Sequence, residues 1–139
     1  MLDPDAIIAA ARQCIGTPFR HQGRLPGEGI DCAGVALHIA AQIGVRTFDV
    51  PGYGRTPVNG LLEQSMDAQP CLQRQALADR QAGDLLLMRF ASDPQHIAIC
   101  AGGTIVHAYE SAGQCCEHDL SSLWEGRIVR VYRFIEAAP

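Results

Sequence analysis

Three residues of this 139-residue chain have the types and the order that nucleophilic catalysis by a cysteine needs. Cys32 follows a glycine-rich loop and opens an apolar segment of helical period, so we expect it in the first turn of a helix. There the free backbone N–H groups and the helix dipole favour a thiolate, and we expect them to lower the pKa of Cys32. His96 and His107 follow later, each next to apolar residues, and an imidazole near neutrality suits proton transfer.

These residues fit a scheme in which a thiol attacks, one histidine takes its proton and a third polar group orients that histidine. Gly102-Gly103 predicts a hairpin turn that pairs positions 96–100 with 104–108 and brings His96 close to His107. A zinc site is the alternative use of this region, with the following ligands: Cys115, Cys116, His118 and His107. That spacing is too tight for a usual tetrahedral site, so we expect no metal ligands.

The elements that position these residues follow from the hydrophobic periodicity. We expect helices over residues 4–14, 31–43 and 58–68, and a turn or half-helix over 120–125. Strands are expected over 84–90, 96–100, 104–109, 115–120 and 127–134. Residues 19–30 read as a loop, 49–57 as an irregular segment in which Tyr53 walls a cleft, and 69–82 as surface. Helices followed by an antiparallel meander predict an α+β layout, with the helices packed on one sheet face.

Composition excludes several classes of function. The chain is 47% hydrophobic and 19% charged, as in ordinary globular proteins, and its length predicts one domain over residues 1–139. A net charge of −4 without a basic run makes nucleic acid a poor partner. No apolar stretch is long enough for a membrane span. The N-terminus lacks the basic and apolar regions of a secretory signal, so we expect synthesis in the bacterial cytoplasm without a signal peptide.

Five short motifs together are typical of one enzyme family: Gly16-Thr17-Pro18-Phe19, Asp31-Cys32-Ala33-Gly34, Gly83-Asp84-Leu85, His96-Ile97-Ala98-Ile99 and Ile105-Val106-His107-Ala108. From near residue 7 to residue 134 the chain resembles the NlpC-type peptidases, papain-like cysteine hydrolases of the bacterial cell wall. The resemblance implies a papain-like α+β fold with helices packed on a five- or six-stranded antiparallel sheet. It places the nucleophile at the start of the second helix.

The resemblance also implies roles for individual residues. Cys32 would be the nucleophile, His96 the general base and His107 the group that orients His96. The substrates would be peptidoglycan stem peptides, cut next to D-glutamate at the γ-D-glutamyl–diamino acid bond, with no cofactor. Backbone N–H groups at the start of the Cys32 helix would hold the oxyanion. Substrate contacts would come from Asp31, from Phe19 and Ala33, which replace the family's Tyr and Ser, and from His21 and Gln22.

The stretch Arg20-His21-Gln22 and the ending Trp124…Arg127-Ile128 most resemble the branch encoded in tailed-phage and gene-transfer-agent tail clusters. That branch implies a virion tail-tip component whose partners are other tail proteins and which opens the cell wall locally. Two alternatives remain. One is an amidase or acyltransferase on the same scaffold. The other is a non-enzymatic structural tail-tip subunit, which the departures at Phe19 and Ala33 favour.

Overall fold

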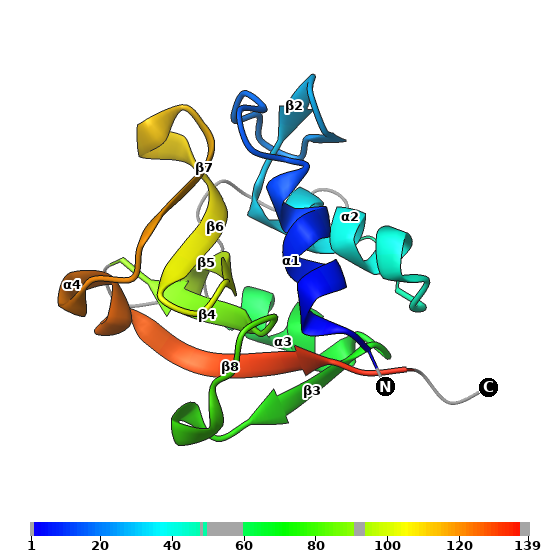
Figure 1. Ribbon diagram of the computed structural model, residues 1–139, viewed down its shortest axis with the longest axis vertical. Coiled ribbons are helices and arrows are strands. Elements are labelled where there is room, and N and C mark those ends of the chain that lie inside the picture. Colours follow the sequence, from blue (N-terminus) through cyan, green and yellow to red (C-terminus); the bar gives the residue numbers. More distant parts are fainter. Residues whose placement is uncertain (1, 48, 50–59, 91–93, 137–139) are drawn as a thin grey trace.

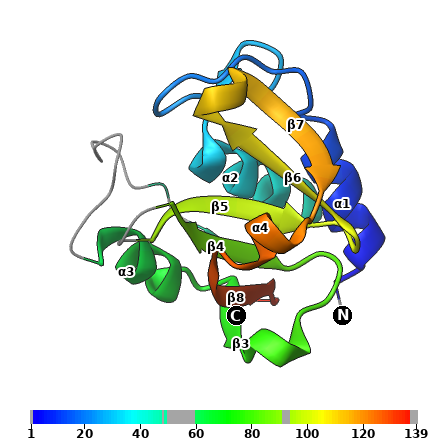
Figure 2. The ribbon, with the colours of Figure 1, turned by 90° about the vertical axis from the view of Figure 1, so that its left-hand side faces the viewer.

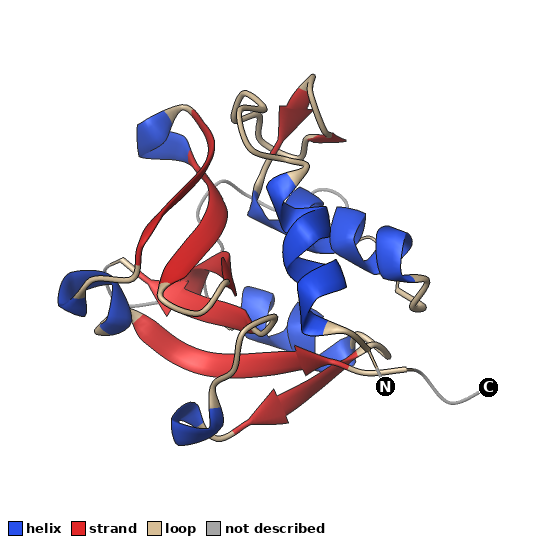
Figure 3. Ribbon diagram, viewed as in Figure 1, coloured by secondary structure: helices blue, strands red, loops and turns tan. Residues whose placement is uncertain are grey.

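The computed structural model describes residues 2–47, 49, 60–90 and 94–136, in which the helices over residues 4–12 and 32–43 lie together on one side of a curved sheet (Figures 1 and 3). The helices are α1 (Pro4–Arg12), α2 (Cys32–Ile43), α3 (Leu61–Ala68) and α4 (Ser122–Glu125), with 3-10 turns at Leu77–Asp79 and Glu110–Ala112. The strands are β1 (Arg24–Leu25), β2 (Gly29–Ile30), β3 (Leu72–Gln75), β4 (Leu85–Arg89), β5 (Pro94–Cys100), β6 (Thr104–Tyr109), β7 (Gln114–Asp119) and β8 (Ile128–Phe134). Within these ranges no helix has the length and hydropathy needed to cross a bilayer.

The two N-terminal helices begin and end where their capping residues stand. Asp3 accepts a hydrogen bond from the backbone N–H of Asp5, and Pro4 occupies the first position of α1. The last helical residue of α1 is Arg12, two residues earlier than predicted. The helix α2 spans the predicted residues and ends at Gly44, which takes the left-handed conformation of a helix C-cap with φ of 75°.

The main sheet has six antiparallel strands in the order β3-β8-β4-β5-β6-β7, which confirms the predicted fold class. Figure 2 shows this order from β7 at the top to β3 at the bottom. The predicted meander holds for β4 to β7, but β8 returns to pair with β4 on the opposite side from β5. Residues 72–75, predicted as surface without a strand, form the edge strand β3, whose partner among the described strands is β8. The predicted loop over 19–30 contains the short ladder of β1 and β2.

The core lies between the sheet and helices α1 and α2. Strand β4 is buried on both faces: Leu85 and Leu87 face the helices, whereas Leu86 and Met88 pack against Trp124 and its neighbours on the other face. Residues that alternate along a strand point to opposite faces, so a continuous apolar run indicates this double burial. The sheet that carries the histidines is therefore fixed by packing from both sides.

The Gly-Asp-Leu motif joins the start of β4 to the C-terminal strand. Asp84 is buried and accepts a hydrogen bond from the backbone N–H of Gln81 at 2.8 Å. Its carboxylate also accepts two hydrogen bonds from the guanidinium of Arg133 in β8, at 2.9 and 3.0 Å. Paired N–H donors in this fork arrangement fix orientation as well as charge. The motif therefore has a structural explanation here, because it fixes the start of β4 to its neighbour β8.

Candidate active site

Cys32 is the first residue of α2, as predicted from the sequence. Asp31 caps the helix, because its carboxylate accepts a hydrogen bond from the backbone N–H of Gly34 at 2.8 Å. A side chain at position 34 would overlap the backbone carbonyl oxygen of Gly23 and the side chain of Ile30. The glycine two residues after the cysteine therefore lets the preceding loop pack directly on the start of the helix.

The buried carboxylate of Asp31 also ties that loop to the start of α2. It accepts hydrogen bonds from the backbone N–H of Gln22 and from the guanidinium of Arg24, each at 2.9 Å. Arg24 in turn donates two hydrogen bonds to Asp49. Gln22 takes a left-handed conformation, with φ of 61°, where the chain turns around this carboxylate. Asp31 thus holds the loop and helix together, and its contact with substrate stays a prediction.

His96 and His107 face each other from neighbouring strands β5 and β6. Nε2 of His96 lies 2.6 Å from Nδ1 of His107, and both side chains are buried. The expected proximity is confirmed, but the predicted register is wrong by one residue, because Ile99 pairs with Val106 and Cys100 with Ile105. In the observed register the two histidines lie on the same face of the sheet, whereas the predicted register would put them on opposite faces.

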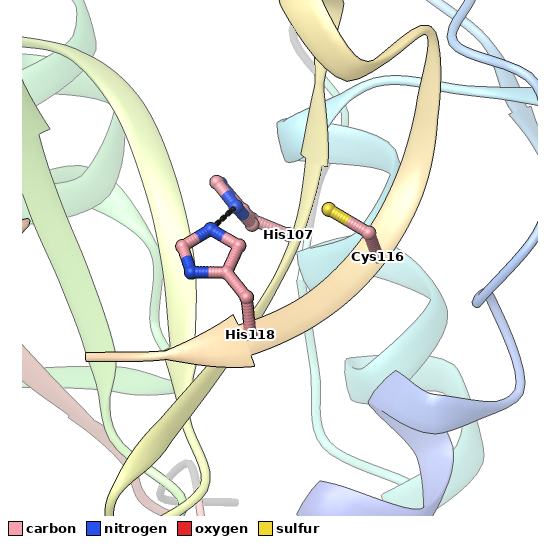
Figure 4. Close-up of side chains that lie close together, drawn as sticks. All are labelled: His107, Cys116 and His118. Atoms are coloured by element: carbon pink, nitrogen blue, oxygen red, sulfur yellow. Dashed lines mark hydrogen bonds between the residues drawn. The ribbon is translucent and has the colours of Figure 1, made fainter. Parts of the chain in front are cut away.

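His118 extends this pair, and the sequence analysis did not assign it to catalysis. It lies on β7, where Cys116 pairs with His107 across the ladder, and residues two apart on a strand share a face. Its Nε2 lies 2.8 Å from Nε2 of His107, and Figure 4 shows the two rings facing each other beside Cys116. The Nδ1 of His118 lies 2.9 Å from the backbone oxygen of Asp119. The strand pairing of β6 with β7 is the signal that could have found it.

The same cluster tests the zinc alternative. Cys115 is fully buried among core residues, because consecutive residues on a strand point to opposite faces. The alternative group of four ligands is therefore not brought together. Among the described residues, one group of three candidate metal ligands lies together, namely His107, Cys116 and His118, whose ligand atoms are within 4.8 Å of one another. The facing nitrogens of the two histidines are already joined by a hydrogen bond.

The electrostatics of the site favour neutral groups at rest. Burial and the negative charge of Asp31 raise the pKa of the Cys32 thiol to about 12, although backbone N–H groups of Ile97 and of the helix start lower it. The prediction that the helix N-terminus lowers this pKa overall is therefore wrong. Burial, with His107 and the charge of Arg127, holds the pKa of His96 well below its usual range. A neutral imidazole is the form that can take the proton of a neutral thiol as the sulfur attacks.

A cleft of about 470 Å³ contains Cys32 and His96 in its wall. Four of the predicted substrate residues also line it: Phe19, His21, Asp31 and Ala33. Gln22 contributes its backbone N–H to the loop, and its side chain is not among the described residues that line the cleft. Tyr53 lies outside the residues that the structure describes. The cleft therefore brings Cys32 and His96 together with most of the predicted substrate residues.

The comparison with family models decides the assignment. The model of the NlpC/P60 family matches residues 16–133, which include the cysteine motif and both histidine motifs. The chain belongs to the NlpC/P60 family. Members of this family are peptidoglycan hydrolases and generally cysteine peptidases. Among curated protein sequences no significant match to this NlpC/P60 chain is found.

Solved structures share the fold of this NlpC/P60 domain. The NlpC/p60 domain of the peptidoglycan hydrolase SagA is 23% identical with a TM-score of 0.65, and the match covers 94% of this chain and 97% of that one. The peptidoglycan hydrolase RipB of Mycobacterium tuberculosis is 20% identical with a TM-score of 0.67, over 96% of this chain and 65% of RipB. NlpC1 of Trichomonas vaginalis is 18% identical with a TM-score of 0.69, over 97% of this chain and 45% of that one. At these identities the likeness shows the papain-like fold.

Proposed function

We propose that this NlpC/P60 chain is a cysteine endopeptidase that cuts peptidoglycan stem peptides next to D-glutamate, at the γ-D-glutamyl–diamino acid bond. One observation carries the proposal: the thiol of Cys32 stands at a helix N-terminus in a cleft that also holds His96, whose Nε2 is held by His107. Because Nε2 of His96 is engaged, Nδ1 is the nitrogen left to take the thiol proton.

Attack begins when Nδ1 of His96 takes the proton of Cys32 as the sulfur bonds to the γ-carbonyl carbon of D-glutamate. The carbonyl π electrons move to oxygen, and backbone N–H groups at the start of α2 stabilise that oxyanion. The intermediate collapses when the C–N bond breaks and the imidazolium of His96 gives its proton to the leaving amine of the diamino acid. Water then attacks the thioester, with His96 again as base, and releases the D-glutamyl carboxylate and the free thiol.

Arg127 supports the choice of D-glutamate. Its guanidinium lines the cleft and stacks over Trp124, with the central carbon 4.3 Å from the ring centroid. Among the described residues it forms no ion pair, whereas Arg24 in the same cleft is paired with Asp31 and Asp49. A γ-linked D-glutamate carries a free α-carboxylate next to the scissile bond, and a guanidinium is the side chain best suited to bind it.

The test is mass spectrometry of the products from sacculi and from a soluble L-alanyl-γ-D-glutamyl-diaminopimelyl peptide under reducing conditions. We expect fragments that end in D-glutamate, with no such fragments from Cys32→Ala and full activity from the matched variant Cys116→Ser. Products split at the sugar–peptide amide would instead establish an amidase. If the folded protein left both substrates intact, the endopeptidase proposal would be wrong and a structural role would be favoured.

We also propose that the enzyme acts on the cell wall as a component of a phage or gene-transfer-agent tail tip. The support is the likeness of Arg20-His21-Gln22 and of the Trp124…Arg127-Ile128 ending to that branch. Immunogold labelling of purified particles tests this directly. Label at the tail tip is expected, and particles that contain tail proteins but lack this chain would contradict the proposal.

A further inference from the structure

Three histidines form one continuous chain of hydrogen bonds that ends at a backbone carbonyl. The contacts run from His96 Nε2 to His107 Nδ1 at 2.6 Å, from His107 Nε2 to His118 Nε2 at 2.8 Å, and from His118 Nδ1 to the Asp119 oxygen at 2.9 Å. Every internal contact joins two ring nitrogens, and a neutral imidazole has one donor and one acceptor nitrogen. The proton positions along the chain are therefore linked.

The carbonyl fixes the direction of the whole chain. The Asp119 oxygen only accepts, so Nδ1 of neutral His118 carries the proton and its Nε2 accepts. Nε2 of His107 must then donate, which leaves its Nδ1 as an acceptor for the N–H of His96. The remaining nitrogen of His96, Nδ1, is left unprotonated. This is the tautomer that a general base for Cys32 requires.

Aromatic packing keeps the rings in these orientations. His107 stacks on Tyr109 with an interplanar angle of 12°, and Trp124 meets both His107 and His118 with ring centroids 5.0 Å apart. A half-turn of a ring would put carbon atoms where its nitrogens stand and break the chain, and the surrounding rings oppose this rotation. The direction of the hydrogen bonds is thus supported by shape as well as by pairing.

We propose that His118 is a positioning residue that sets the tautomer of the base His96 through His107. The proposal rests on the peptidase function, because only a reaction that uses His96 as base needs that tautomer. The side chain at position 118 must therefore accept a hydrogen bond from His107. A donor at the same place would reverse the chain and leave His96 with a proton on Nδ1, where it cannot accept one from the thiol.

Tautomers are read directly by nitrogen-15 NMR of the histidine rings at pH 8, above the ordinary histidine pKa of about 6.5. We expect His96 and His107 to carry their protons on Nε2 and His118 to carry its proton on Nδ1. A proton on Nδ1 of His96 in the folded wild-type protein would overturn the proposal. This measurement needs no turnover, so it remains decisive if the peptidase function itself fails.

Three substitutions separate accepting from mere space filling. His118→Gln offers an oxygen to His107 and an amide N–H to the Asp119 carbonyl, so kcat should stay within about threefold of wild type. His118→Leu removes the acceptor and should lower kcat about 10- to 100-fold, with KM unchanged. His118→Lys only donates and should lower kcat further, towards loss of the 10²- to 10⁴-fold that a general base contributes. Equal losses for Gln, Leu and Lys at matched thermal stability would contradict the proposal.

Cys116→Ser provides the matched control. Cys116 lies beside the two rings, yet it is not a member of the hydrogen-bond chain. If the chain acts through proton positions alone, this variant keeps both the tautomers and the turnover of wild type in metal-free buffer. If His107, Cys116 and His118 instead acted by holding a metal ion, Cys116→Ser would lower turnover, and adding a metal chelator to the wild-type enzyme would lower it too. That result would overturn the proposal.

Discussion

Replacing Asp31 by alanine should cost more stability than the loss of an ordinary helix cap. The buried carboxylate satisfies the N–H groups of Gly34 and Gln22 and the guanidinium of Arg24. Loss of a helix cap costs about 1 kcal/mol. A backbone N–H left unpaired in a part-buried place costs about 1 to 3 kcal/mol. Arg24 keeps Asp49 as a partner, so its contribution to the loss is small.

Together, the lost helix cap and the unpaired N–H should lower the free energy of unfolding of Asp31→Ala by about 3 kcal/mol. This corresponds to a fall of roughly 10 °C in Tm for a chain of this length. Asp3→Ala is the matched control, because Asp3 caps α1 through one exposed hydrogen bond to Asp5. In urea denaturation, the free energy of unfolding should fall about three times as much for Asp31→Ala as for Asp3→Ala. Since the Asp31 charge also raises the pKa of Cys32, Asp31→Ala should make the thiol more reactive at pH 8.

Equal losses of stability in the two variants would refute the reasoning. They would mean that the bonds to Gln22 and Arg24 contribute nothing beyond the cap. A lower reactivity of Cys32 in folded Asp31→Ala would refute the electrostatic part separately. Alkylation followed by peptide mass spectrometry measures that reactivity at Cys32 alone.

Three further predictions concern single residues. Because folding raises the pKa of Cys32 to about 12, the folded state holds the thiol proton more tightly than an unfolded chain, whose thiols ionise near about 8.5. This contribution to the free energy of unfolding is therefore complete below about pH 8 and is lost as the pH rises. At pH 7 iodoacetamide should alkylate Cys32 more slowly than it alkylates the thiol of free glutathione. Faster alkylation of Cys32 would indicate a thiolate at rest. Gly34→Ala should lower the free energy of unfolding, measured by urea denaturation, by about 1 to 3 kcal/mol. Gly103→Ala should lower it much less, because a Cβ at position 103 would meet no atom within 4 Å. Similar losses in the two variants would argue against tight packing at Gly34. Arg127→Gln should raise KM about tenfold for stem peptides that carry a free α-carboxylate on D-glutamate. It should leave KM unchanged for stem peptides in which that carboxylate is amidated. An equal rise in KM for both substrates would exclude recognition of the carboxylate.

Local sequence signals predicted the elements that carry the site. The Asp-Cys-x-Gly motif with its apolar period placed Cys32 at the start of α2, because capping and periodicity are local properties. Alternating apolar residues gave the strands that hold His96 and His107. The strand β3 is not predicted, since its residues are mostly polar and lie at the sheet edge, where their partner among the described strands is the distant β8.

Properties that depend on tertiary structure were not accessible in the same way. The helix dipole argument for a low pKa of Cys32 omitted burial, which is the largest cause of the raised value. The place of His118 depends on the register of β6 with β7, where Cys116 stands opposite His107. A hairpin prediction off by one residue cannot supply such a register, because each shift by one residue turns a side chain to the other face.

The division of the site between a helix and a sheet explains why its geometry depends on the core. The thiol comes from α2 and the imidazoles from β5 and β6, so the distance between them is set by packing across the layer. Val35 and Ile39 of α2 belong to the same buried cluster as Ile97 of β5 and Val106 of β6. A cavity in that cluster would let the helix shift against the sheet, and a displacement of about 1 Å at a reacting pair can cost 10²-fold in rate. Ile39→Ala should therefore lower kcat as well as stability, although Ile39 lies two turns from the thiol.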